Sequence, residues 1–289
     1  MYPARAGFWI QLPSGRTLEL GTRPLVMGIV NVTPDSFAES VSLLDPSMAI
    51  EAGQRMALAG ADLLDVGGES TRPGAEPISA EEECDRILPV LEGLTTRVQV
   101  PVSVDTYKAG VARAALAAGA SIVNDISGLA MDPALGQAVA GAGAALILMH
   151  TRGRPKTMYH EAVYVDVVAE LIRELRGSIG TATAAGVPRD RIIVDPGIGF
   201  AKRAAHSYGV LARLPELAAA LDRPVLAGPS RKSFMQEALG GRPPTERDWG
   251  TAAAVAAAVL NGAHIVRVHA VPEMVQVVRV AEEIRRHGE

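Results

Sequence analysis

Residues that can bind a polar small molecule follow each of eight short apolar runs in the sequence. They are carboxylates, carboxamides, imidazoles and cations, namely Asn31, Asp65, Asp105, Asn124, His150, Asp195, Lys232, Arg267 and His269. Side chains of these types supply donors and acceptors for a polar ligand. The chain carries 28 basic and 32 acidic residues and a formal charge of −4, so any anionic ligand must be held by a few placed cations.

The apolar runs that precede these residues have the character of buried parallel strands. They are continuous rather than alternating and cover residues 25–30, 61–66, 100–104, 121–123, 144–149, 191–194, 224–227 and 264–268. Ala-rich segments of helical period separate them, and Ser79 with Glu82 forms a capping-box pattern before one of these segments. Eight strand–helix units predict an α/β fold, a (β/α)₈ TIM barrel rather than a doubly wound sheet. The strand ends would then meet on one rim, where barrels build their active sites.

Length and composition limit the number of domains and the classes of partner that we expect. The 289 residues are 48% hydrophobic and 21% charged, which is typical of a globular protein. Residues 8–21 predict a short N-terminal β-hairpin, and no Pro/Gly/Ser-rich linker divides the chain, so we expect one domain over residues 1–289. No apolar stretch reaches the roughly 18 residues of a membrane span, and neither a signal core nor a dominant basic patch is present. We therefore expect a cytoplasmic protein with no nucleic-acid or membrane partner.

Seven blocks of the sequence, in order, resemble the dihydropteroate synthase family of pterin-binding barrels. They cover residues 29–37, 65–74, 103–106, 124–128, 195–200, 230–234 and 267–269, and include Asp-Pro-Gly at 195–197 and Ser-Arg-Lys-Ser at 230–233. The resemblance implies an alkyl-transfer reaction of folate biosynthesis. In it, p-aminobenzoate displaces diphosphate from 6-hydroxymethyl-7,8-dihydropterin diphosphate and gives 7,8-dihydropteroate.

The resemblance also assigns residues to the two organic substrates. Asp105, Asn124 and Asp195 would pair with the polar edge of the pterin, and Lys232 would reach its ring with a compact ammonium. Ser233 would bind the aminobenzoate carboxylate at the start of a helix, where free N–H groups favour an anion. Residues that would line the aminobenzoate path are Thr71, Arg72, Pro73 and Phe200.

The diphosphate end is assigned in the same way. Arg267 and His269 are two apart on a strand, so they point to the same side and can both donate to phosphate oxygens. Asn31 resembles the family's Mg²⁺ contact, and one neutral oxygen suffices because Mg²⁺ binds mainly through substrate phosphates. The sequence suggests no Ser–His or Cys–His pair for covalent catalysis. We therefore expect a dissociative displacement in which Asp105 or Asp35 supports a cation-like carbon.

Departures from the family pattern leave alternatives open. After Phe37 the family usually continues Ser-Asp-Gly-Gly, whereas this chain reads Ala-Glu-Ser-Val-Ser, and Ala270 stands where an aspartate is common. The alternatives are an inactive pterin-binding paralogue and a methyltetrahydrofolate methyltransferase-like barrel, which would not need Ser-Arg-Lys-Ser or Arg-x-His.

The resemblance further implies sulfonamide inhibitors and a homodimer, formed through the late helices at residues 249–261. His150 stays open between a contact at the rim and a structural role.

Overall fold

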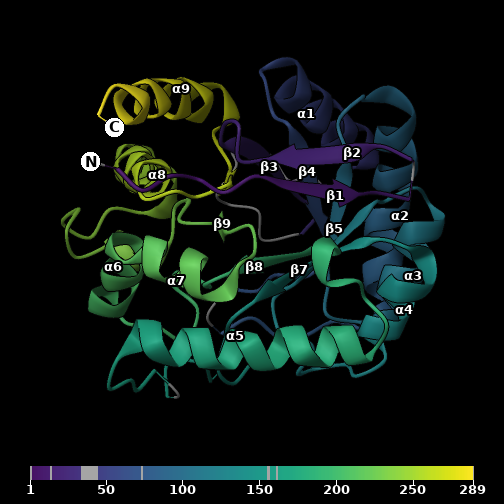
Figure 1. Ribbon diagram of the computed structural model, residues 1–289. Coiled ribbons are helices and arrows are strands. Elements are labelled where there is room, and N and C mark those ends of the chain that lie inside the picture. The colour runs from purple at the N-terminus through teal and green to yellow at the C-terminus, as the bar shows by residue number, and fades with distance from the viewer. Residues whose placement is uncertain are drawn as a thin grey trace.

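A parallel β-barrel forms the centre of the molecule (Figure 1). The computed structural model describes residues 2–13, 15–33, 45–72, 74–154, 157–160 and 162–288. The eight strands are β3 (Leu25–Asn31), β4 (Leu63–Gly67), β5 (Val102–Asp105), β6 (Ile122–Asp125), β7 (Ala145–Met149), β8 (Ile192–Asp195), β9 (Leu226–Ala227) and β10 (Ile265–Val268). Their order is β8-β7-β6-β5-β4-β3-β10-β9. A parallel bridge between Val194 and Val225 joins the two outer strands, so the barrel is nearly closed and the predicted fold is confirmed.

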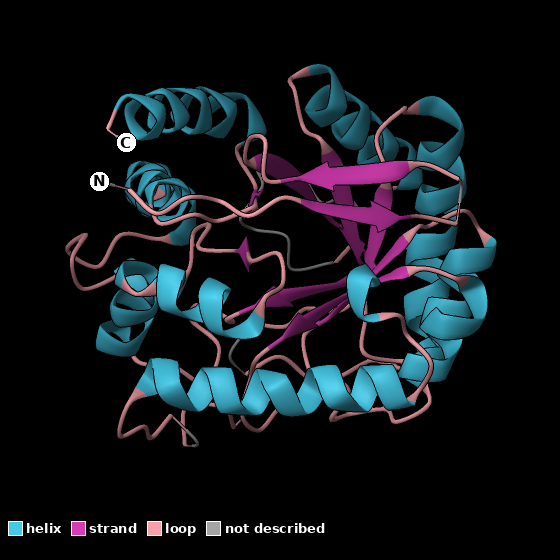
Figure 2. Cartoon of the chain, viewed as in Figure 1, coloured by secondary structure: helices cyan, strands magenta, loops and turns pink. Residues whose placement is uncertain are grey.

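Helices lie outside the strands (Figure 2). They are α1 (Pro46–Leu58), α2 (Ala80–Arg97), α3 (Ala109–Ala117), α4 (Leu135–Ala142), α5 (Val167–Ala184), α6 (Ala204–Ala212), α7 (Leu214–Leu221), α8 (Asp248–Leu260) and α9 (Val271–His287). The predicted cap of α2 is present, because Ser79 Oγ accepts the N–H of Glu82 at 3.0 Å. Pro215 lies in the first turn of α7, and because proline has no N–H to continue a helix, it separates α7 from α6. No helix in the described ranges is both long and apolar enough to cross a membrane.

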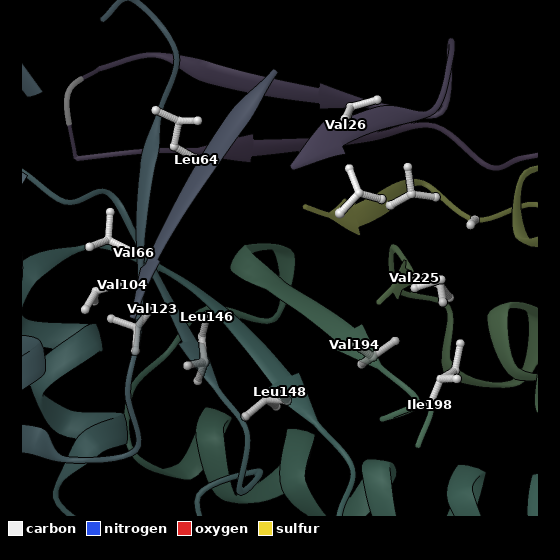
Figure 3. Packing of buried hydrophobic residues seen from close by; sticks show 14 of the residues in the cluster. Val26, Leu64, Val66, Val104, Val123, Leu146, Leu148, Val194, Ile198 and Val225 are labelled. Atoms are coloured by element: carbon white, nitrogen blue, oxygen red, sulfur yellow. The ribbon is translucent and has the colours of Figure 1, made fainter. Parts of the chain in front are cut away.

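The pleat of the strands divides their side chains between two layers. Outward-facing residues such as Leu64, Val66 and Val104 are fully buried and pack in one cluster with the helices (Figure 3). In β3, β4, β6, β8 and β10 the inward-facing residues are apolar near the start of the strand and polar near its end. Leu63 and Asp65 of β4 show this change within three residues, and both are completely buried. The barrel interior therefore has an apolar lower layer and a polar upper layer.

The predicted N-terminal hairpin covers the lower layer. Strand β1 (Phe8–Gln11) pairs antiparallel with β2 (Thr17–Leu20), with Phe8 opposite Leu20. The side chains of Ile10 and Leu20 are fully buried in a cluster with the inward residues at the starts of the barrel strands, such as Leu63 and Ile122. The hairpin therefore seals the N-terminal end of the barrel and leaves the C-terminal end for the site.

Candidate active site

A cavity of about 380 Å³ opens at the C-terminal ends of the strands. Nine of the predicted site residues line it: Asn31, Thr71, Arg72, Asp105, Phe200, Lys232, Ser233, Arg267 and His269. Asn124 and Asp195 do not line the cavity, because both are only 4% exposed and lie in the polar layer beneath it. Asp35 and Pro73, also predicted for the site, lie outside the described residues. Ligands of this cavity would therefore meet residues from seven of the barrel strands or the loops that follow them.

Arg267 lies between two carboxylates inside the barrel. Its Nε donates to Asp65 Oδ2 at 2.6 Å and its Nη2 donates to Asp105 Oδ2 at 2.8 Å. Asn124 Nδ2 also donates to Asp65 Oδ2, at 2.9 Å. Asp65 thus orients Arg267, which was predicted to bind phosphate, and Asn124, which was predicted to bind the pterin. The sequence placed Asp65 among the polar residues of the strand ends but assigned it to neither substrate. The available signal was the alternation along β4, which places Asp65 on the inner face.

The charges in this cluster are strongly coupled. Burial raises the pKa of Asp105 to about 7, although the neighbouring Arg267 acts in the opposite direction. Burial also acts to lower the pKa of Arg267, but Asp65 and Asp105 outweigh it and hold that pKa above its ordinary value. Arg267 therefore stays charged, and the protonation of Asp105 is sensitive to pH near neutrality.

Lys232 and Asp195 lie near enough in the polar layer for each to influence the charge of the other. Lys232 Nζ donates to the carbonyl of Ile198 at 2.6 Å and lies 4.6 Å from the centre of the Phe200 ring. Gly228 lies beside both groups, since a Cβ atom on it would be 3.7 Å from Lys232 Nζ and 3.9 Å from Asp195 Oδ2. Burial lowers the pKa of Lys232 to about 8, against the attraction of Asp195, and burial raises the pKa of Asp195.

His269 is held by a serine from the neighbouring loop. Ser230 Oγ accepts the backbone N–H of His269 at 3.2 Å and lies 2.9 Å from its Nδ1. With its oxygen already accepting, the hydroxyl can donate to Nδ1, which leaves the ring proton on Nε2. Burial and the cations around it hold the pKa of His269 well below its ordinary value, so the ring is neutral. The sequence suggested no Ser–His pair. The structure contains this one, but its geometry makes the histidine an acceptor at Nδ1 and a donor at Nε2.

The end of the cavity at Ser233, predicted to bind the aminobenzoate carboxylate and here called the acceptor end, differs from the sequence prediction. Ser233 begins η2 (Ser233–Met235), a 3₁₀ helix of three residues, so the predicted helix N-terminus is a single short turn. A second hydroxyl is present instead, because Tyr159 OH lies 2.9 Å from Ser233 Oγ. Tyr159 comes from the loop after β7 and was missed, since nothing in its local sequence indicates that it returns to residue 233.

The loop that carries Thr71 and Arg72 is fastened at its base by Lys108. Lys108 Nζ bonds Glu69 Oε2 at 2.6 Å, Glu83 Oε2 at 2.6 Å and the carbonyl of Ile78 at 2.8 Å. Glu69 Oε2 also accepts the N–H of Ile78 at 3.1 Å. We call these four residues the Lys108 clasp. It joins the two ends of the loop to the start of α3, directly after Asp105.

His150, left open by the sequence, belongs to a buried network beside the cavity. Its Nδ1 lies 3.0 Å from Lys202 Nζ and its Nε2 lies 2.8 Å from Glu174 Oε2. Lys202 Nζ also donates to the carbonyl of Phe200 at 3.0 Å. Burial lowers the pKa of Lys202 to about 7, against the attraction of Asp195, and burial with the Lys202 charge lowers the pKa of His150 to about 4. The network ties the end of β7 to the turn that carries Phe200.

The described residues hold no cluster of three His, Cys, Asp or Glu side chains that could bind a metal ion. Asn31 lines the cavity with Arg267 and His269. A neutral amide oxygen beside groups that can donate to phosphate fits a Mg²⁺ that arrives with a phosphorylated substrate, since Mg²⁺ keeps several waters and takes few protein ligands. The donor set does not fit a resident zinc site, which needs three or four nitrogen, sulfur or carboxylate ligands.

The sequence matches known proteins along nearly its whole length. The profile of a family described as pterin binding enzymes covers residues 27–269. Dihydropteroate synthase from Synechocystis sp. is 45% identical over 276 residues, with 95% of each chain covered. Dihydropteroate synthase from Escherichia coli K12 is 44% identical over 271 residues, which cover 93% of this chain and 94% of that one.

Solved structures agree with the sequence comparisons. Yersinia pestis dihydropteroate synthase with a sulfonamide drug complex superposes with a TM-score of 0.90 at 42% identity, and covers 99% of this chain and 100% of that one. Xanthomonas albilineans dihydropteroate synthase with 4-aminobenzoic acid gives a TM-score of 0.88 at 42% identity, with 97% and 99% covered.

Proposed function

Because this chain belongs to the dihydropteroate synthase family of pterin-binding enzymes, we propose that its rim cavity performs that family's reaction as follows. p-Aminobenzoate displaces diphosphate from 6-hydroxymethyl-7,8-dihydropterin diphosphate, and the products are 7,8-dihydropteroate and diphosphate. The observation that supports this placement best is the gathering of nine predicted site residues around one cavity, at the end of the barrel opposite the sealed end.

The polar layer is proposed as the pterin seat. Asp195 and Asn124 lie deepest, and Asp105 faces the cavity above them. A carboxylate that accepts two N–H groups of a pterin, beside a carboxamide that can donate and accept, matches the edge of that ring. Lys232 can transfer one hydrogen bond from the Ile198 carbonyl to the pterin, since an ammonium has three donors. The bond from Asn124 Nδ2 to Asp65 supports this placement, because it holds the amide and leaves its oxygen to accept from a ligand.

The opposite side of the cavity is proposed for the diphosphate. His269 offers an Nε2 donor, and Arg267 keeps its charge while two of its nitrogens are held by Asp65 and Asp105. Asn31 would hold Mg²⁺ together with the substrate phosphates. When bound there, Mg²⁺ stabilises negative charge on the diphosphate as a Lewis acid. Fixed donors aimed at developing charge are usually the largest catalytic contribution.

The order of bond breaking follows from these groups. Ser230 is bound as a donor to His269 and accepts a backbone N–H, so it is poorly placed to attack carbon. The pterin can delocalise positive charge at its hydroxymethyl carbon, and the Asp105 carboxylate can support that charge. We therefore propose that the C–O bond breaks ahead of attack by the amine, with Asp35, which lies outside the described residues, as a second carboxylate for the same task.

Assay of dihydropteroate formation from the two substrates tests the function directly. Turnover supports the synthase. Binding of the pterin diphosphate without turnover indicates the inactive paralogue, and transfer of a methyl group from methyltetrahydrofolate indicates the methyltransferase alternative.

Pterin diphosphate labelled with ¹⁸O at the bridging position tests the order of steps. Without aminobenzoate, label should scramble into non-bridging positions. No scrambling, together with a rate that rises steeply with amine basicity, would contradict early C–O cleavage.

The acceptor end is proposed for p-aminobenzoate and its sulfonamide mimics, which should compete with it. Thr71, Arg72 and Phe200 line this path, and Pro73 is assigned to it from the sequence.

A homodimer is also proposed. Trp249, at the start of α8, is 88% exposed, whereas the inner face of α8 packs within the chain. Sedimentation of wild type and Trp249→Glu tests it, with dissociation of the variant as the expected result. The cytoplasmic location stays a prediction from the sequence.

A further inference from the structure

The pair of hydroxyls at Tyr159 and Ser233 marks one end of the site cavity. Both residues line the cavity, and their oxygens lie 2.9 Å apart. The same two residues also line a second, more open cavity of about 540 Å³, together with Arg203 and Gln236. The pair therefore forms the partition between the two cavities. A ligand that extends from the first cavity toward the second must meet both hydroxyls.

Tyr159 is held in this position by the segment around it. Its neighbour Met158 is only 2% exposed, and the N–H of His160 bonds the carbonyl of Thr157 at 3.0 Å in a tight turn. The hydroxyl of Tyr159 also donates to the carbonyl of Gly199 at 3.4 Å. That bond is long and therefore weak, so the phenol can give it up for a better acceptor.

Two of the charged groups nearby are engaged with other partners. Arg231 Nε and Nη2 each bond a carboxylate oxygen of Asp248 at 2.7 Å, and Lys232 Nζ points to Ile198. The turn at Ser233 is too short to act as a helix end for an anion. Tyr159 and Ser233 each carry one rotatable O–H at this wall, so either can donate to a negative group while it accepts from the other.

We propose that Tyr159 determines specificity for an anionic acceptor: its phenolic hydroxyl, paired with Ser233, donates to the carboxylate para to the reacting amine. This inference rests on the proposed function, because it assigns the acceptor end of that cavity. A hydrogen bond to a charged group contributes more than one to a neutral group. Loss of the phenol should therefore weaken 4-aminobenzoate more than 4-aminobenzamide, its neutral analogue of similar shape.

The test compares Tyr159→Phe with a matched control from the same loop. Tyr164 OH donates to the carbonyl of Ala201 at 3.0 Å and its ring packs on Arg152, and Tyr164 does not line the site cavity. In Tyr159→Phe, KM for 4-aminobenzoate should rise about tenfold and KM for 4-aminobenzamide less than about threefold, the ratio expected when a charge-assisted bond is lost. Affinity for the pterin diphosphate, measured by calorimetry, should be unchanged. Tyr164→Phe should match wild type in all three values.

A double-mutant cycle with Ser233→Ala measures whether the two hydroxyls act together. The effects on KM for 4-aminobenzoate should be non-additive, because each hydroxyl positions the other. Equal losses for the acid and the amide in Tyr159→Phe, or an unchanged KM for the acid, would overturn the inference while leaving the synthase activity intact. Absence of turnover in the wild-type protein would instead overturn the proposed function.

Discussion

Replacement of Arg267 by leucine removes a cation that two inward-facing carboxylates share. Asp65 is completely buried, and the side chains of Asp105 and Arg267 are 12% and 18% exposed. Removing one partner of a buried ion pair costs about 3–5 kcal/mol, because the remaining charge is left without compensation. Here two carboxylates lose the same partner, so we expect a loss of unfolding free energy toward the upper end of that range.

The loss should also depend on pH. The folded-state pKa of Asp105 is about 7, above its ordinary value of 3.8, so the folded protein binds this proton more tightly than the unfolded chain does. Stability from this group is therefore greatest at low pH and falls as pH rises from about 4 to about 7. Without Arg267 the folded-state pKa rises further, so the variant keeps losing stability above pH 7. The gap between wild type and variant should widen with pH.

Urea unfolding followed by circular dichroism, at about pH 5 and about pH 8, measures both effects. The matched control is Arg23→Leu, which breaks an Arg–Asp pair with Asp62 at the other end of the barrel, where Arg23 is 54% exposed. Exposed pairs contribute about 0–1 kcal/mol, so the control should change little at either pH. Adding Asp65→Asn to Arg267→Leu should restore part of the stability. A loss below about 1 kcal/mol, or an equal loss at both pH values, would refute this account of the cluster.

Three further predictions concern activity. The pKa of Lys232 is about 8 and that of Asp105 about 7, so kcat/KM for the pterin diphosphate should fall above pH 8 and below pH 7, and Lys232→Arg should move the alkaline limit upward. Asp195→Asn should weaken pterin binding about tenfold or more in calorimetric titration, since a donor would then face a donor. Lys108→Met should raise KM for aminobenzoate several-fold and increase hydrogen exchange across residues 70–77, with pterin affinity retained. An unchanged exchange rate would show that the clasp does not hold that loop.

Much of the fold was predictable because strands buried on both faces have a simple composition. The apolar runs at 144–149 and 264–268 contain the observed strands β7 and β10. The residues after each run could be assigned to one site because parallel strands of a barrel end on the same rim. The motif residues Asp105 and Lys232 do lie at that rim. The sequence pattern therefore predicts where each strand lies and which end of it faces the site.

Side-chain pairing was not predictable from the same pattern. Asp65 and Arg267 are 202 residues apart, and their contact depends on closure of the barrel between β10, β3 and β4. Tyr159 reaches Ser233 across 74 residues through a loop of no regular structure. Adjacent polar residues can also face opposite ways: Asn124 points inward, whereas Asp125 accepts the N–H groups of Ser127 and Leu129 in its own loop. These contacts follow from tertiary geometry, which one sequence does not encode locally.

The hairpin that seals the lower end of the barrel has a kinetic consequence. With Ile10 and Leu20 buried against the strand starts, ligands can enter and leave the cavity only through the opposite mouth. Asp195 lies at the bottom of that path and Ser233 is exposed at its entrance. A molecule bound at Ser233 would therefore lie between solvent and the deeper position at Asp195. If the amine binds at Ser233 and the pterin at Asp195, as proposed, we expect the pterin to bind before the amine and the joined product to leave before a new pterin enters. Excess amine should then slow turnover by occupying the entrance of an empty site.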